Sequence, residues 1–259
     1  MASSPSRREV LAALGALGCW HRAAAADEAQ APPQPPQPTP PTLQASLVKP
    51  GLYLITGGGG NSLLRFSNNG LVLVNGKSPD SYQPLMSQVH RINKLSDMPI
   101  RALILTNAED AQAANSGRFA AAKVAIVVQA NALPRLPEAA AALVPFDRDY
   151  SLQFGGIEVA VRYFGKARGD ADAVVHFADK KLVALGDLYS PNELQAAAMD
   201  GGNLAGWSEA LGQVLALDFE QAVPNEGPIV GRAEVIEFKR RLDARLAARD
   251  QPNQPNFMA

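Results

Sequence analysis

Few of the side chains that commonly bind metals or perform covalent catalysis occur in this chain of 259 residues. Its histidines are His21, His90 and His176, and its single cysteine is Cys19. One cysteine can form neither an internal disulfide nor a cysteine-based zinc site. So small a number of imidazoles argues against a histidine-rich metalloenzyme.

The candidate nucleophiles also lack partners in the sequence. Ser62, Ser116 and Ser190 lie in no motif that supplies a supporting histidine, so a serine triad is not expected. His90 falls in a helical pattern and His176 in a strand pattern, and we expect each to be a structural or surface histidine rather than a ligand. The four glycines at 57–60 precede a strand-like run rather than a helix, which predicts a wide loop instead of a dinucleotide-binding turn.

Composition narrows the class of protein. The chain is 47% hydrophobic, and its 24 basic and 25 acidic residues give a formal net charge of −1. This length and apolar content suffice for one large domain with a real core. The balanced charge and the absence of long basic runs argue against a nucleic acid as partner.

Residues 1–26 have the features of an export signal. Arg7 and Arg8 directly precede a short apolar run, the twin-arginine pattern, and the alanines at 24–26 offer a cleavage site. The apolar run is about half of the ~20 residues that a transmembrane helix needs, so we expect no membrane span. We therefore expect a periplasmic protein. Lipid anchoring at Cys19 and a cytoplasmic amphipathic N-terminus are the alternatives.

Three segments are predicted after the signal. Residues 27–46 are rich in proline and glutamine, which indicates an extended, polyproline-like linker. Residues 47–249 form the folded domain, and residues 250–259 a disordered tail.

Within the folded domain, apolar periodicity predicts two strand-rich halves, each followed by helices. The Asn-Gly pair at 69–70 lies between two apolar runs and predicts a hairpin. Two sheets packed face to face with helices outside, an αββα sandwich of the α+β class, satisfy this order. The predicted strands are 52–55, 62–66, 71–74, 100–105, 123–128, 151–154, 158–163, 173–177, 182–185 and 221–223; the helical segments are 81–95, 113–121, 204–217 and 232–249.

Several blocks together resemble the metallo-β-lactamase fold superfamily over nearly the whole folded domain. They are the hairpin that begins at 50–55, the strand at 99–106, the segment 172–177, the Gly186-Asp187 turn, and the turn at 223–230. The resemblance implies two mixed sheets flanked by helices. It also implies a hydrolase whose zinc ions are held by a His-x-His-x-Asp-His motif, a middle histidine, a bridging aspartate and a final histidine.

The residues at these family positions are mostly not zinc ligands: Asn107, Glu109, Ala111 and Gln112 in the first motif, Arg168 in the middle loop, Glu226 in the last turn, Asp187 at the bridging position, and Asn75 where the family has an acidic residue. Amide oxygens are weak zinc ligands, and a guanidinium stays protonated and repels a divalent cation. The resemblance therefore implies a member that has lost its zinc, with no other cofactor. We interpret Arg168 as a replacement for the metal, paired with Glu109, Asp187 or Glu226.

Three functions remain open. The first is a non-catalytic protein whose cleft binds a small anionic ligand through Arg168 and Lys166, with Asn107 and Gln112 as hydrogen-bonding groups, or binds a periplasmic protein. The second is a hydrolase of an ester, lactone, thioester or related bond. It would use Glu109, Asp187 and Glu226 as acid–base groups or as ligands of Mg²⁺ or Ca²⁺. The third is a structural accessory of an exported complex.

Overall fold

The computed structural model describes residues 41–190 and 203–250. The predicted signal, residues 27–40 of the predicted linker and residues 251–259 of the predicted tail lie outside the described residues, whereas Asp250 ends helix α5 (Arg232–Asp250). The chain divides into units of residues 1–38 and 39–259, and only the second contains described residues. The folded part begins before residue 47, because Leu43 is 5% exposed and strand β1 (Gln44–Lys49) pairs with β2 (Leu52–Thr56).

The first sheet has seven strands in the order β1-β2-β3-β4-β5-β6-β7. Its first four strands pair antiparallel and the rest pair parallel. The predicted Asn-Gly hairpin is confirmed, with Ser67 opposite Gly70. The further strands are β3 (Ser62–Ser67), β4 (Gly70–Val74), β5 (Ile100–Ile104), β6 (Ala125–Gln129) and β7 (Leu143–Phe146).

The second sheet has six strands in the order β13-β12-β11-β10-β9-β8. Only the β11–β12 pair is parallel. The strands are β8 (Asp149–Phe154), β9 (Ile157–Tyr163), β10 (Ala173–Phe177), β11 (Leu182–Gly186), β12 (Gln221–Pro224) and β13 (Val230–Gly231).

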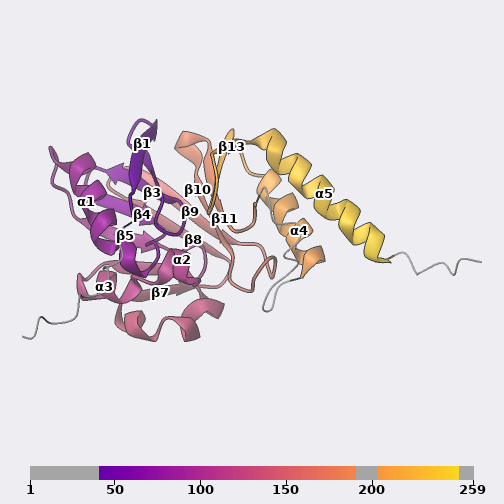
Figure 1. The fold of residues 1–259 in the computed structure, drawn as a ribbon, viewed down its shortest axis with the longest axis horizontal. Helices are drawn as coiled ribbons and strands as arrows, with labels where there is room; N and C mark the ends of the chain where they lie inside the picture. Colours follow the sequence, from indigo (N-terminus) through magenta and orange to yellow (C-terminus); the bar gives the residue numbers. More distant parts are fainter. Residues whose placement is uncertain (1–40, 191–202, 251–259) are drawn as a thin grey trace, which may run out of the picture. The chain divides into compact units, whose positions relative to one another are not determined.

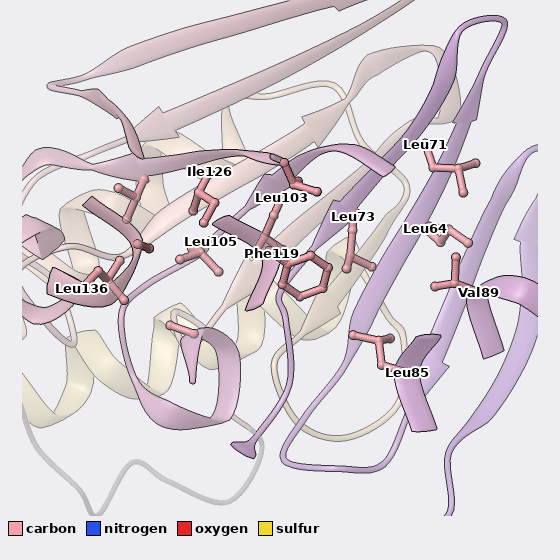
Figure 2. Packing of buried hydrophobic residues seen from close by; sticks show 14 of the residues in the cluster. Leu64, Leu71, Leu73, Leu85, Val89, Leu103, Leu105, Phe119, Ile126 and Leu136 are labelled. Atoms are coloured by element: carbon pink, nitrogen blue, oxygen red, sulfur yellow. The ribbon is translucent and has the colours of Figure 1, made fainter. Parts of the chain in front are cut away.

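The helices cover the outer faces of the two sheets (Figure 1). On the first sheet, Leu64, Leu73 and Leu103 pack against Leu85 of α1 and Phe119 of α3, and Figure 2 shows this cluster. The helices are α1 (Tyr82–Asn93), α2 (Asp110–Ala113), α3 (Ser116–Ala121), α4 (Leu204–Leu215) and α5 (Arg232–Asp250), with 3₁₀ turns η1 (Pro79–Ser81), η2 (Ala130–Arg135), η3 (Pro137–Ala142) and η4 (Ala178–Lys180).

Two further buried clusters complete the layers. Between the sheets, Leu63 and Ile104 of the first pack with Val175 of the second. On the outer face of the second sheet, Trp207 of α4 and Phe238 of α5 lie with their ring centroids 5.7 Å apart. The predicted αββα sandwich of two mixed sheets is confirmed. None of the helices in the described ranges is both long enough and apolar enough to span a membrane.

Three strands were not predicted from the sequence. In each, the residues give only a weak strand signal, for a physical reason. β7 contains Pro145, which lacks a backbone donor and is tolerated because β7 is an edge strand. β1 is also an edge strand, and its mixed polar residues show no clear alternation. β13 has only two residues.

Candidate functional site

Loops from both sheets meet where β5, β11 and β12 end and β10 begins. Ala173 N donates to Thr106 O at 2.7 Å, and Asn225 N donates to Gly186 O at 2.8 Å. Asn75 fixes the loop after β5, because its Oδ1 accepts from both the N and the Oγ1 of Thr106 at 3.0 Å. These bonds bring residues from distant parts of the chain to one edge of the sandwich.

Asp187 lies at the centre of this edge. Its Oδ2 accepts from Asn107 Nδ2 at 2.7 Å and from Gln112 Nε2 at 3.4 Å. Arg168 Nη1 is 3.5 Å from the same Oδ2 and 2.8 Å from Glu109 Oε1. The side chains of Arg168 and Asp187 are each 13% exposed. The structure therefore brings together these five sequence-predicted residues.

The remaining predicted residues lie at the rim or outside. Ala111 and the exposed Glu226 line a cavity of about 80 Å³ together with Glu109 and Asp187. Lys166 is exposed and lines neither this cavity nor the larger one described below. In residues 41–190 and 203–250, no three His, Cys, Asp or Glu side chains are grouped so that they could hold a metal ion.

A second cavity, of about 300 Å³, adjoins the same arginine and is lined by residues that were not predicted from the sequence. Asp172, Asp170 and Arg135 line it together with Glu109 and Arg168. Arg135 Nη2 is 2.8 Å from Asp170 Oδ1, and Asp172 is 4% exposed and accepts from the Gly169 N–H. The sequence signal that could have indicated this cavity is the pair Asp170 and Asp172, just before the buried strand β10.

Burial and like charge shift the titration of this site. Burial raises the pKa of Asp172 to about 6; the Gly169 N–H opposes this, and the charge of Asp187 adds to it. Burial also raises the pKa of Asp187, although Arg168 opposes the shift. Burial alone would lower the pKa of Arg168, but the nearby carboxylates of Asp187 and Glu109 outweigh it and raise that pKa. Negative charge is thus in excess around one guanidinium.

We expect Asp172→Asn to stabilise the protein by about 1–3 kcal/mol at about pH 8. The pKa of this carboxyl rises from 3.8 to about 6 on folding. The folded state therefore binds more protons than the unfolded state between these values, and stability falls as the pH rises through that window. Calorimetric unfolding from about pH 4 to 8 measures the effect, with exposed Asp149→Asn as control. Destabilisation by Asp172→Asn at about pH 8 would contradict the raised pKa of this carboxyl.

The histidines and serines named above have structural partners or lie elsewhere. His176 Nε2 is 2.9 Å from the Asp218 carbonyl, and His90 is exposed on α1. Ser62 and Ser116 donate to backbone carbonyls, at 2.8 and 2.6 Å. Ser190 lines the smaller cavity.

The glycine loop at 57–60 encloses a buried lysine, Lys77, that was not predicted from the sequence. Lys77 is 1% exposed, and its Nζ donates to the carbonyls of Ile55 at 2.7 Å, Gly57 at 2.8 Å and Gly60. Burial lowers its pKa to about 7. The loop abuts the site, because a Cβ on Gly60 would lie 2.5 Å from Asn225 Oδ1.

This four-layer sandwich, with its site at the loop edge, defines a fold shared by metallo-β-lactamases. A metallo-β-lactamase from Pontibacter korlensis superposes with a TM-score of 0.68 at 16% identity, covering 78% of this chain and 99% of that one. FIM-1 from Pseudomonas aeruginosa, in its mono-zinc form, gives 0.65 at 18% identity, covering 80% and 96%. IND-7 gives 0.67 at 18% identity, covering 78% and 98%.

These likenesses establish the metallo-β-lactamase fold for this chain. By sequence, no protein-family model and no curated protein matches it.

Proposed function

We propose that this chain is an exported metallo-β-lactamase-fold protein that has lost the zinc site and binds a small ligand in its cleft without catalysing a reaction. The observation that carries the proposal is the position of Arg168. Its guanidinium lies 2.8 Å from Glu109 and 3.5 Å from Asp187, so a permanent cation neutralises the central carboxylates.

The donor set does not fit zinc. Asn107 presents its Nδ2 to Asp187 as a hydrogen-bond donor, and a donor nitrogen cannot bind a metal at the same time. A zinc ion on Asp187 Oδ2 would also lie within a few ångströms of the Arg168 guanidinium, and the two cations would repel each other. We therefore assign no step to a metal.

Metal analysis tests the zinc-free part of the proposal. Purified protein incubated with zinc and desalted is expected to retain far less than one ion per chain by inductively coupled plasma mass spectrometry. The matched variant combines Asn107→His, Glu109→His, Arg168→His and Glu226→His, which should restore imidazoles and raise the zinc content. Near-stoichiometric zinc in the natural protein would overturn the proposal.

One observation favours a second candidate, a hydrolase that uses carboxylate chemistry. Glu109, Asp187 and Glu226 line one cavity, so two of them could divide the acid and base roles. Assays on β-lactam, lactone, thioester and phosphodiester substrates test this candidate. Turnover that Glu109→Gln or Asp187→Asn abolishes would support it, and no turnover on any substrate would count against it.

The export part of the proposal rests on the arginine pair and apolar run in residues 1–26. Mass spectrometry of protein recovered from the periplasm should show a mature N-terminus after residue 26. A lipidated Cys19 would instead show the alternative anchor. Pull-down from a periplasmic extract tests for a protein partner.

A further inference from the structure

The larger cavity has the size and wall chemistry of a small polar binding site. Its volume of about 300 Å³ is at the lower end of the ~300–1,000 Å³ that is typical of small-molecule sites. The charged groups on its wall are Glu109, Asp170, Asp172, Arg135 and Arg168. A ligand there would contact these five charged side chains as well as the small residues Ala108, Gly169 and Ala171.

The arginines of this wall are already engaged by carboxylates. Arg135 is 2.8 Å from Asp170, and Arg168 is paired with Glu109 and lies near Asp187. Because both guanidinium groups have carboxylate partners, an incoming anion would have to displace a side chain. The earlier expectation of an anionic ligand depended on Arg168 and Lys166, and Lys166 lies outside both cavities.

Carboxylates outnumber cations around this cavity among the described residues. Asp172 has no ion pair of its own in the described part of the chain, and it adds its charge to those of Glu109 and Asp187 around Arg168. The wall of the larger cavity therefore carries more carboxylates than guanidinium groups.

We propose that the cavity binds a small organic cation, a primary ammonium or guanidinium compound, whose charge rests between Asp172 and Glu109. This inference depends on the proposed zinc-free binding function and names its ligand class. Such a cation supplies N–H donors to carboxylates that now share Arg168. A bare divalent metal ion supplies no N–H donors, and among the described residues no three His, Cys, Asp or Glu side chains are grouped to coordinate it.

Isothermal titration calorimetry on the full chain tests the ligand class. The probes are agmatine and 1,4-diaminobutane as cations, succinate as a dicarboxylate of similar length, and magnesium chloride. At least one cation should bind saturably with one ligand per chain, whereas succinate and magnesium should give no saturable heat. Binding by succinate or magnesium in place of the cations, or by none of the four probes, would overturn the proposal.

Variants locate the binding. Asp172→Asn keeps an acceptor for the Gly169 N–H but removes one charge, and it should weaken cation binding roughly tenfold or more. The control Glu158→Gln changes an exposed carboxylate on β9 and should leave affinity unchanged. Equal affinity of Asp172→Asn and the natural chain would place the cation elsewhere and overturn the proposal.

The metal content of the same sample distinguishes a failure of the proposed zinc-free function from a failure of the proposed ligand class. A zinc-loaded protein would remove the proposed function and this inference together. A zinc-free protein that binds succinate would contradict only the ligand class.

Discussion

Replacing Arg168 by methionine is expected to lower the free energy of unfolding by about 3–5 kcal/mol at about pH 8. The guanidinium is 13% exposed and faces Glu109 and Asp187 at 2.8 and 3.5 Å. Methionine preserves most of the side-chain volume but leaves the largely buried carboxylate of Asp187, and the exposed one of Glu109, without this cation. Urea denaturation monitored by circular dichroism measures the loss.

The pH dependence distinguishes an electrostatic role of Arg168 from a packing role. The pKa of Asp172 is about 6, and burial also raises the pKa of Asp187. At about pH 5 these carboxyls take up protons more readily, so the Arg168→Met variant should lose less stability there than at pH 8. The control Arg240→Met removes an exposed pair on α5 and should change stability little at either pH. An equal loss at both pH values would contradict the electrostatic explanation.

Replacing Lys77 by methionine is expected to loosen the glycine loop and to destabilise the protein by about 2–3 kcal/mol. The substitution removes the donors that satisfy the carbonyls of Ile55, Gly57 and Gly60. Relief from burying an ammonium offsets only part of this loss. Hydrogen exchange across residues 55–62 and urea denaturation measure the two effects.

The pH dependence of stability provides a second check on Lys77. Its pKa falls from 10.5 to about 7 on folding, so the unfolded state binds more protons between these values. The free energy of unfolding of the natural protein should therefore increase as the pH rises from about 7 to 10.5. The Lys77→Met variant should lack this increase. Exposed Lys94→Met is the matched control. A Lys77→Met protein with unchanged loop exchange would contradict the role assigned to this ammonium.

The layered fold could be predicted because the inner strands carry strong local patterns. The runs at 71–74, 100–105 and 173–177 are mostly apolar and rich in valine, isoleucine and leucine, and they correspond to the strands β4, β5 and β10. Helix α1 has apolar positions at Leu85 and Val89 that face the first sheet. The edge strands β1, β7 and β13 were missed because their own residues give weak strand signals: β1 shows no clear alternation, β7 contains Pro145, and β13 has only two residues.

The candidate site was predictable only in part. The resemblance placed Asn107, Glu109, Gln112, Arg168 and Asp187 in one cleft, and the structure brings these five together. The larger cavity and its Asp172 were missed, because a carboxylate in a loop shows in sequence neither its burial nor the charges that face it.

The sequence by itself determined which charges and ligands exist: three histidines, one cysteine and nearly balanced acids and bases. It also determined the order of strands and helices, since side-chain periodicity is local. Only the tertiary structure decided which charges meet. Arg168 and Glu109 are 59 residues apart, and Lys77 reaches carbonyls 17 to 22 residues before it. Coulomb and desolvation energies depend on distance and burial in space, and neither follows from spacing along the chain.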